Sequence, residues 1–576
     1  MKKTIPYGVS DYEELVRENG YYVDKTQYIE SLEQIKNPVF LRPKRFGKSM
    51  LCRILECYYN IRQKDDFVKL FGHTYIGKHP TPHKNSCFVL HLDFSTIDPS
   101  GSINKIEKEF NHDCNLQLKS LISLNKNWFQ KNITVDENES ASSNLKTIMN
   151  FIHEKQLPLL YVIIDEYDNF ANKLIVSNKD SLYINLMDED SFLKTFFKTL
   201  KNGRKKGLIF NVFITGVLPI TIDDLASGFN IASFITLDPE FENMLGFTQS
   251  EVDILLDEIF IEYKIDPSIR NNVNDVIKNQ YNGYHFISTS GKALYNSTIL
   301  MYFLSWLCRF KTIPDRLTDM NLKTDIKWIK RLTASNSEYT ETFVNQLMFN
   351  NSIKYDEVLL VEKFNMSQFF EKGFFPVSFF YLGILTKKDD FHLKLPNLNM
   401  RKIFVEYFNE IHRIDVSTRY TEIMQRFLND LNLHALFSGY WKEYISQLPE
   451  AIFQQVNENF YRTTFYELCS RYLSKWFTWN VERSYPQGRT DLEFVGKFNE
   501  KLAGVRIVIE FKYYSNAELR KKKIRIENFK LQDADTKQIQ GYSIGLKQEY
   551  PDSKIKQYVI YCFANKGFKV FDYIDS

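Results

Sequence analysis

The sequence predicts an α/β protein built from several domains. A chain of 576 residues is too long for one hydrophobic core and suggests about three or four domains of roughly 150 residues each. Apolar residues make up 44% and charged residues 25%, which is typical of a globular chain and not of a disordered one. Between residues 37 and 245, apolar strand-like segments alternate with helical patterns, and this alternation favours a parallel sheet covered on both faces.

The elements follow one another in a clear order. In the first part, strands are predicted at residues 37–41, 86–95, 157–168 and 207–217. In the last part, a helix at 451–477 precedes strands at 491–495 and 505–514, a basic helix at 518–546 and a strand at 555–565. We therefore predict an α/β core at 1–245, a helical lid at 246–330, a helical connector at 331–450 and a second α/β domain at 451–576. The connector offers no recognisable chemistry.

The charge is unevenly distributed along the chain. The formal net charge is only +3, so it gives no global argument for nucleic-acid binding. Residues 451–576 carry 21 Lys and Arg against 15 Asp and Glu, whereas the preceding 450 residues have a net charge of −3. The basic excess therefore lies in the C-terminal part.

The cysteines and the N-terminus indicate a cytoplasmic protein. The seven cysteines are scattered singly, and an odd count without a Cys-x-x-Cys pair argues against a disulfide framework and a zinc site. The N-terminus lacks an apolar signal segment, and no run reaches about eighteen apolar residues, so no membrane association is expected.

The segment "RPKRFGKSM" (42–50) follows a predicted strand and opens a predicted helix. In a phosphate-binding loop, backbone N–H groups hold the phosphates, the lysine reaches the β/γ-phosphates and the serine hydroxyl contacts Mg²⁺. The usual pattern has glycine where this chain has Arg42, so a helix start that happens to read Gly-Lys-Ser is the alternative. The predicted nucleotide-contacting residues are Arg42, Pro43, Lys44, Arg45, Phe46, Gly47, Lys48 and Ser49.

Two later strands carry the residues that such a loop needs. "YVIIDEYD" places Asp165 and Glu166 directly after four apolar residues, which suits a carboxylate that reaches Mg²⁺ and a second one that polarises the attacking water. "FITGV" places Thr215 at a strand tip, where a polar sensor of the γ-phosphate is expected. ATP and Mg²⁺ are the predicted cofactors, with Ser49 and Asp165 near the metal.

The N-terminal motifs resemble those of the bacterial AAA-ATPase-like family over about residues 1–300. The motifs are "YYVDKTQYI", "FLRPKRFGKSM", "IIDEYDN", "FITGV", "GFTQSEV" and "YNGYHF". The resemblance implies that Arg42 is a family trait, and that Asp24 and Lys25 border the nucleotide. Arg42 and Arg45 would add positive charge at the phosphates, or form salt bridges within the fold. AAA-type ATPases often act between subunits, so a homo-oligomer is expected, and Arg204 is a candidate arginine finger.

The C-terminal segment "IVIEFKYY" (507–514) places two charged residues in an apolar strand. Side chains alternate between faces, so Val508, Glu510 and Lys512 share one side. The preceding segment "GRTDLEFVG" begins with Gly488, which can form a turn, and pairing of the two strands brings Asp491 to Glu510. Two carboxylates suit Mg²⁺, and a nearby lysine can orient water and stabilise phosphate charge. The alternative is a surface ion pair worth at most about 1 kcal/mol.

The string Gly-Arg-Thr-Asp…Ile-Glu-Phe-Lys resembles the PD-(D/E)XK nuclease superfamily over about residues 451–576. The resemblance implies a restriction-endonuclease-like α/β domain behind the P-loop NTPase sheet. It implies Asp491 and Glu510 as metal ligands and Lys512 as the catalytic lysine. Glu458 on the preceding helix and Gln538 on the following helix match further superfamily positions. The aspartate is not preceded by proline, at a position that varies in the superfamily.

A basic cluster lies between the Lys512 strand and Gln538. It comprises Arg520, Lys521, Lys522, Lys523 and Arg525. Such residues can contact phosphates without reading sequence, although a solvated charged face is the alternative. Tyr513 and Tyr514 can stack on bases or pack within the sheet.

Together these features predict ATP-controlled, Mg²⁺-dependent cleavage of nucleic acid, with DNA the favoured substrate. A non-catalytic nucleotide-switched nucleic-acid-binding protein, or a mobile-element or defence factor that cuts only with a trigger, remains the alternative.

Overall fold

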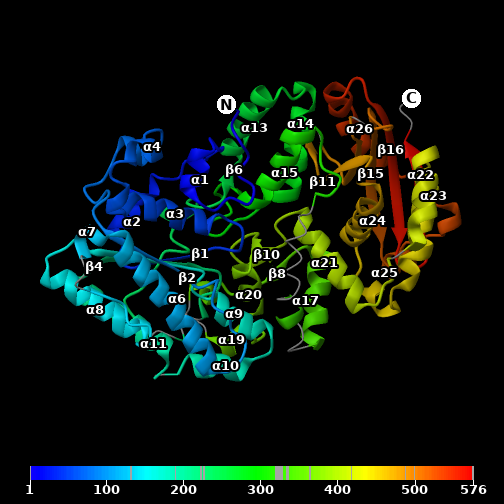
Figure 1. Cartoon of the computed structure of the whole chain (residues 1–576). Coiled ribbons are helices and arrows are strands. Elements are labelled where there is room, and N and C mark those ends of the chain that lie inside the picture. Colours follow the sequence, from blue (N-terminus) through cyan, green and yellow to red (C-terminus); the bar gives the residue numbers. More distant parts are fainter. Residues whose placement is uncertain are drawn as a thin grey trace.

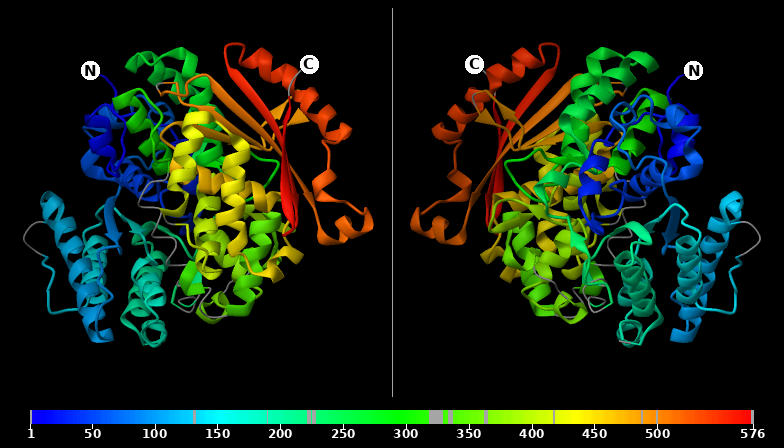
Figure 2. Two further views of the ribbon diagram at one scale, coloured as in Figure 1. Left: turned by 90° about the vertical axis from the view of Figure 1, so that its right-hand side faces the viewer. Right: turned by 90° about the vertical axis from the view of Figure 1, so that its left-hand side faces the viewer.

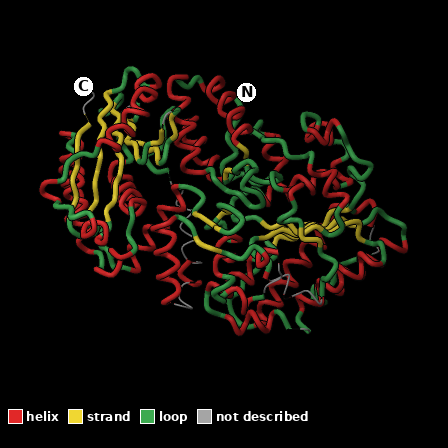
Figure 3. The backbone as a smooth tube through the Cα atoms, turned by 180° about the vertical axis from the view of Figure 1, so that it is seen from behind, coloured by secondary structure: helices red, strands yellow, loops and turns green. Residues whose placement is uncertain are grey.

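The computed structural model of the chain describes residues 2–129, 133–188, 190–220, 224, 228–317, 329–332, 337–361, 365–416, 418–486, 488–498 and 500–573. Two five-stranded sheets lie towards opposite ends of the molecule, with helices around and between them (Figure 1). Figure 3 shows the same separation from behind. The predicted α/β class is confirmed.

The first sheet is parallel, with strand order β2-β3-β4-β1-β5. Its strands are β1 (Pro38–Leu41), β2 (Phe88–Asp93), β3 (Leu160–Asp165), β4 (Ile209–Gly216) and β5 (Ser233–Phe234). The four predicted strands are confirmed, and β5 is too short to show a strand pattern. Phe40 pairs with Thr215 and Asp93 with Asp165, so the carboxyl ends of these strands meet at one edge.

Helices cover both faces of this sheet. α3 (Lys48–Tyr59) packs on β2 and β3 from one side, and α6 (Ile103–Leu124) packs on β2 from the other. The alternation of side chains along β2 explains this arrangement, because His91 contacts Glu56 of α3 whereas Phe94, the residue directly after β2, packs on Phe110 of α6. The remaining helices of this part are α1 (Tyr12–Arg17), α2 (Tyr28–Gln34), α4 (Phe67–Phe71), α5 (Tyr75–Lys78), α7 (Lys126–Phe129), α8 (Ala141–Glu154), α9 (Asn169–Val176), α10 (Asp180–Leu186) and α11 (Phe192–Lys205).

The middle of the chain is mostly helical, as expected, but also contains strands. Its helices include α13 (Gln249–Tyr263), α14 (Arg270–Tyr281), α15 (Ser297–Phe310), α17 (Ser337–Asn350), α18 (Val358–Val361), α19 (Met366–Phe369), α20 (Phe375–Tyr381), α21 (Leu398–Ile411), α22 (Thr421–Asp430) and α23 (Leu433–Glu443). Short strands β6 (Phe247–Thr248) and β7 (Leu294–Tyr295) pair beside the lid helices. An antiparallel sheet of β8 (Ile353–Lys354), β9 (Thr386–Lys387) and β10 (His392–Lys394) lies within the predicted connector. Strands of two or three residues are too short to show an alternating pattern.

The second sheet has the order β11-β14-β15-β16-β17, and only β15 and β16 are parallel. Its strands are β11 (Phe477–Val481), β14 (Leu492–Gly496), β15 (Val505–Tyr514), β16 (Lys554–Phe563) and β17 (Gly567–Tyr573), with a small hairpin of β12 (Ser484–Tyr485) and β13 (Gly488–Arg489) beside it. The predicted pairing of the Asp491 and Glu510 strands is confirmed. β11 and β17 were not expected from the sequence.

The two faces of β15 pack as the alternating pattern predicts. Ile507, Ile509 and Phe511 belong to the core on the side of α24 (Glu458–Leu473), whereas Val508 packs with α26 (Asp533–Glu549). Figure 2 shows this sheet between the yellow helices and α26 in red. The expected single basic helix at 518–546 is wrong. It is divided into α25 (Asn516–Lys521) and α26, because Lys523 adopts a left-handed backbone with φ +51°.

The lid helix α14 packs against β11 of the second sheet. Asp275 forms an ion pair of 2.6 Å with Arg483, and Asn279 donates to Asn480 at 3.2 Å. These contacts join the N-terminal part directly to the C-terminal sheet. Among the described helices, none has the length and apolar character needed to cross a membrane.

Candidate functional site

The loop between β1 and α3 turns sharply before the helix begins. Gly47 caps α3 with φ +96°, a conformation that glycine adopts without strain, and Arg45 also has a positive φ of +71°. The Lys48 side chain is buried and folds back over the loop, where its Nζ donates to the carbonyl oxygens of Arg42 at 3.0 Å and Pro43 at 3.1 Å. To reach a phosphate, this ammonium must exchange these two carbonyls for phosphate oxygens.

The lid holds the outer side of the same loop. Asn296, which caps α15, donates to the Lys44 carbonyl at 3.1 Å, and the Thr298 N–H donates to the Arg45 carbonyl at 3.1 Å. Phe46 is buried and packs edge-on against Tyr284 and Phe286. The exposed Lys44 is therefore held through its backbone carbonyl. A movement of the loop would change its hydrogen bonds to the lid. The contribution of Asn296 was missed because it lies 252 residues away in sequence.

The Arg42 side chain does not face the loop opening. Its guanidinium is buried between the rings of Phe40 and Phe286 and donates to the Thr236 carbonyl at 2.8 Å. Burial lowers the pKa of Arg42 to about 9. The expectation that this side chain adds charge at the phosphates is thus corrected in favour of the alternative role within the fold. The guanidinium takes part in no ion pair among the described residues, and its partners are carbonyl groups.

The carboxylates at the end of β3 lie beside the loop. Asp165 is buried, and the Ser49 hydroxyl hydrogen-bonds to it from the first turn of α3. Burial raises the pKa of Asp165, and the Ser49 hydrogen bond opposes that rise. Glu166 follows with a positive φ of +50° and is only half-buried. The structure thus brings Ser49, Asp165 and Glu166 together as predicted.

Two neighbours stabilise the strand ends next to this group. Thr215 is buried and its hydroxyl donates to the Phe40 carbonyl at 2.7 Å, so in this structure it joins β4 to β1. Asp168, which was not singled out in the sequence, accepts from the N–H groups of Val217 and Leu218. Burial, with the nearby Glu166 charge, raises the pKa of Asp168 to about 6.

A largely apolar cavity of about 260 Å³ adjoins the loop. Its lining includes Val9, Tyr22, Lys25, Gly47, Met50 and Met301. A cavity of this kind next to a phosphate loop suits the base of a nucleotide. Lys25 lines it and forms an ion pair of 2.6 Å with Glu251, whereas Asp24 accepts from the Thr26 and Tyr75 N–H groups and lies outside the lining.

Arg204, the candidate arginine finger, is bound by groups of its own fold. Its Nε donates to Asn37 Oδ1 at 2.7 Å, and its Nη1 donates to the Ile209 carbonyl at 2.7 Å. Asn37 precedes β1 and Ile209 begins β4, so Arg204 lies at the amino ends of the strands, at the sheet edge opposite the phosphate loop. A basic residue before a predicted strand did not by itself indicate where its side chain would lie.

In the C-terminal domain, the acids of two strands meet. Asp491 Oδ2 accepts from the Phe511 N–H at 2.8 Å, which holds the carboxylate against β15 beside Glu510. Glu510 is buried, and burial and the adjacent Asp491 charge raise its pKa far above the usual range. The predicted convergence of Asp491 and Glu510 is confirmed.

Three further predicted residues join this pair. Gln538 of α26 donates to Glu510 Oε2 at 2.9 Å and accepts from Lys512 Nζ at 2.9 Å, so it bridges the acid and the lysine. Lys512 Nζ also lies 3.8 Å from Glu510 Oε2. Burial and the nearby Asp491 charge raise the pKa of Glu458 to about 7. All five predicted residues therefore lie at one corner of the second sheet.

Arg462 was missed by the sequence analysis. It lies on α24, four residues after Glu458, and its buried guanidinium donates to Asp491 Oδ1 at 3.1 Å and to Glu482 Oε1 at 3.0 Å. A buried cation stabilises the two carboxylates that it contacts. Its spacing from Glu458 on one helix face was the available signal.

The donors at this corner fit a divalent cation. Glu510 Oε1 is buried, and the Tyr542 hydroxyl and the Asp491 carboxylate are its close polar neighbours. Asp491 and Glu510 offer only oxygen atoms, which Mg²⁺ prefers. The closeness of these two acids is explained if a cation binds here.

The basic cluster is exposed beside the corner. Its residues lie on α25, which begins two residues after the end of β15, and in the loop that follows α25. They are Arg520, Lys521, Lys522, Lys523 and Arg525. Tyr514 packs against Phe529 and Phe563, and Tyr513 packs against Tyr461. For the two tyrosines, packing within the domain is therefore the role that the contacts support.

We expect Glu510→Gln to stabilise the metal-free C-terminal domain at pH 8. The ordinary pKa of a glutamate is 4.5, so above pH 4.5 the unfolded chain loses the Glu510 proton whereas the folded domain keeps it. The free energy of unfolding of the wild type therefore falls as the pH rises from 4.5 towards the raised pKa of the folded domain. Glutamine has no proton to lose, so the stability of the variant does not fall over this pH range. Its melting temperature should exceed that of the wild type by about 2–4 °C for each kcal/mol of difference in the free energy of unfolding. Fluorescence of the buried Trp479 on β11 reports the transition.

The difference should vanish near pH 4, and Mg²⁺ should stabilise the wild type more than the variant. Asp552→Asn changes an exposed acid in the same domain and should show neither effect. Equal destabilisation by Glu510→Gln at pH 4 and pH 8 would contradict the assigned protonation.

Both the N-terminal and the C-terminal part of the chain match models of known protein families. Residues 6–226 match the family model described as predicted AAA-ATPase, and residues 456–571 match that of the PD-(D/E)XK nuclease superfamily. The protein thus joins an AAA-ATPase-like part to a nuclease-superfamily domain, as the motifs indicated.

One curated relative is an uncharacterized protein in the vnfD 5′ region of Azotobacter chroococcum mcd 1, 25% identical over 301 residues. The match covers 51% of this chain and 50% of the relative, so the chain spans about half the length of the curated relative it matches. A structure of the Aeropyrum pernix ORC2 protein in ADPNP–ADP complexes is 12% identical with a TM-score of 0.31, covering 69% of this chain and 92% of that one.

Proposed function

We propose that the protein binds ATP with Mg²⁺ at the 42–49 loop and Asp165, and that it cleaves phosphodiester bonds of DNA at its C-terminal corner under nucleotide control. The observation that carries the proposal is the meeting of Asp491, Glu510 and Lys512 at one corner of the second sheet. The two acids offer oxygen ligands of the kind that Mg²⁺ prefers, which supports metal-dependent chemistry.

The residues at the corner have distinct roles in this proposal. Asp491 and Glu510 would hold Mg²⁺, which supplies Lewis-acid activation of water and phosphate when bound. Lys512, positioned by Gln538, stabilises negative charge on the phosphate and orients the attacking water. Glu458 has a pKa raised to about 7, which suits a group that exchanges a proton near neutral pH. The exposed basic cluster would bind the DNA backbone.

The contacts of the lid provide the route for nucleotide control. Loop carbonyls are bound to the N-terminus of α15, and α14 of the same lid forms an ion pair with Arg483 of the C-terminal domain. A phosphate that takes the place of the carbonyl partners of Lys48 would favour a different conformation of the loop, and through the loop a different position of the lid. Homo-oligomer formation and a cytoplasmic location are further parts of the proposal.

A second candidate is a nucleotide-switched protein that binds DNA without cutting it. Arg462 favours it, because its guanidinium already neutralises Asp491 at 3.1 Å and could take the place of a metal ion. In that case DNA binding would persist in EDTA and no phosphodiester bond would be broken.

The deciding experiment uses the full chain with plasmid DNA, single-stranded DNA and RNA, with Mg²⁺ or EDTA and with or without ATP. We expect Mg²⁺-dependent cleavage of DNA that ATP changes in rate. Lys512→Met should lower the rate by about 100-fold because one charge at the phosphate is lost, while DNA affinity stays the same. Lys554→Met, an exposed lysine at the start of β16, is the matched control. DNA binding without cleavage under all conditions would instead support the second candidate.

A further inference from the structure

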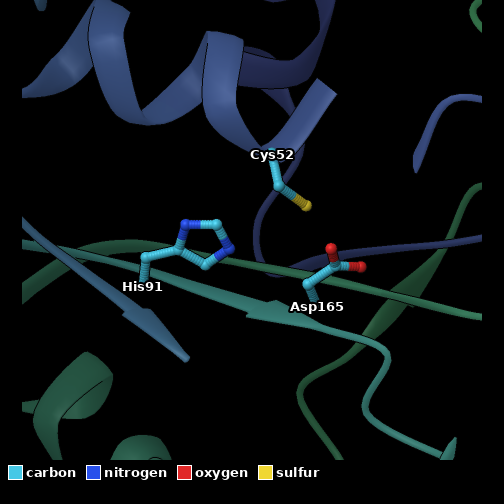
Figure 4. A group of neighbouring side chains, drawn as sticks. All are labelled: Cys52, His91 and Asp165. Atoms are coloured by element: carbon cyan, nitrogen blue, oxygen red, sulfur yellow. The ribbon is translucent and has the colours of Figure 1, made fainter. Parts of the chain in front are cut away.

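Three ligand-type side chains meet below the phosphate loop, outside the sites described above except for Asp165. Cys52 comes from α3, His91 from β2 and Asp165 from the end of β3. One ligand atom of each lies within 4.8 Å of the others. Figure 4 shows the three side chains pointing towards one another from these elements.

The imidazole of His91 is oriented for coordination. Its Nδ1 lies 2.7 Å from Glu56 Oε2, so the N–H is assigned to Nδ1 and the lone pair to Nε2. His91 Nε2 is buried and has no hydrogen-bond partner among the described residues. A carboxylate behind a histidine that faces other ligands is the arrangement found around protein-bound zinc.

We propose that Cys52, His91 and Asp165 bind a transition-metal ion, Zn²⁺ or one of similar preference, with the fourth position open. Thiolate, imidazole and carboxylate are the ligands that Zn²⁺ takes, at about 2.0–2.3 Å. A tetrahedral ion sets its ligand atoms roughly 3.5 Å apart, so the three side chains need to close by about 1 Å. Binding converts the Cys52 thiol into a metal-bound thiolate and releases its proton to solvent.

A cavity lies next to one of the three ligands. It has a volume of about 280 Å³ and is lined by His91, Glu56 and Asp93, whereas Cys52 and Asp165 lie outside its lining. The ligands lie 39 and 74 residues apart on three elements, with no Cys-x-x-Cys or His-x-x-x-His spacing. The absence of a Cys-x-x-Cys pair therefore does not exclude a metal site that is assembled from distant segments.

The site has one consequence that depends on the proposed function. Asp165 is also the carboxylate expected beside the Mg²⁺ of the nucleotide, so Zn²⁺ and Mg²⁺-ATP would compete for it. The two proposals are tested separately, because metal binding is measured without nucleotide.

The test uses the full chain, stripped with a chelator and titrated with Zn²⁺ against a chromophoric competitor. We expect Cys52→Ser and His91→Gln each to lower Zn²⁺ affinity more than about 100-fold, and Glu56→Gln by about 10–100-fold. With Co²⁺ in place of Zn²⁺, a thiolate-to-metal charge-transfer band should be present in wild type and absent in Cys52→Ser. Cys57→Ser, a buried cysteine on the same helix, is the control and should keep both affinity and band.

The proposal is overturned if wild type binds no more Zn²⁺ than Cys52→Ser, or if the Co²⁺ band persists in that variant. Circular dichroism checks that the variants fold. If Cys52→Ser does not fold, the Zn²⁺ affinity of His91→Gln decides the outcome. With the site established, Zn²⁺ should weaken binding of Mg²⁺-ATP to wild type and not to His91→Gln. Failure of this last result alone would count against the nucleotide site and leave the metal site in place.

Discussion

Asp491→Asn is expected to lower Mg²⁺-dependent DNA cleavage by at least about 1,000-fold, because a metal ion contributes several kcal/mol to the transition state and its binding needs both acids. The Phe511 N–H and Arg462 donate to different oxygens of Asp491, at 2.8 Å and 3.1 Å, and asparagine keeps one of these two acceptors at nearly the same volume. The variant therefore loses the negative charge and one hydrogen bond, and circular dichroism checks that it folds. The measurement is the initial rate of plasmid nicking under saturating DNA.

Asp552→Asn is the matched control, since it removes the charge of an exposed acid in the same domain. The rate of this variant should equal that of wild type. If Asp491→Asn cleaves at a wild-type rate in Mg²⁺ while remaining folded, the corner is not where phosphodiester bonds are broken.

Lys48→Ala is expected to weaken ATP binding by about 100-fold or more, since it removes a charge-assisted hydrogen bond to the phosphates worth about 3 kcal/mol. The lysine is buried, and its present partners are two carbonyl groups of the loop, so the variant loses a cation that is held against the loop backbone. Anisotropy of a fluorescent ATP analogue measures the affinity.

Lys64→Ala, an exposed lysine after α3, should leave the affinity unchanged. Cleavage by Lys48→Ala should match the rate of wild type without ATP and lose its response to ATP. An unchanged response would show that the 42–49 loop is not the controlling nucleotide site.

The lid-to-sheet contacts explain why these two results should be linked. The loop and the C-terminal corner share no residue, but Asn296 and Asp275 of the lid contact the loop and the second sheet, respectively. Coupling through packed elements of this kind requires the lid to adopt two arrangements. The different cleavage rates with and without ATP would measure the size of that coupling.

Most of the fold and much of the site were predictable from local patterns. Apolar segments identified the four main strands of the first sheet, and the alternation around Glu510 predicted which side chains of β15 face each layer. Ser49 also lies beside Asp165 as predicted, and Asp491, Glu510, Lys512 and Gln538 lie together at the second sheet as predicted. These predictions succeeded because each depends on residues close in sequence or on strands that must pair to bury their apolar faces.

Other features depended on contacts between distant segments. The Arg42 guanidinium points into the core because Phe40, Phe286 and the Thr236 carbonyl surround it, and nothing in the loop sequence indicates this. Arg462 reaches Asp491 from a helix, and the small β8–β10 sheet arises from strands too short to recognise.

By itself, the sequence determined the order of the main strands and helices, the two motif-bearing segments and the residue types that each offers. Only the tertiary structure decided which of those residues face one another, and it alone brought Cys52, His91 and Asp165 within 4.8 Å. The physical reason is that local patterns reflect the period of a helix or strand, whereas a site is assembled where separate elements pack and their side chains share one volume.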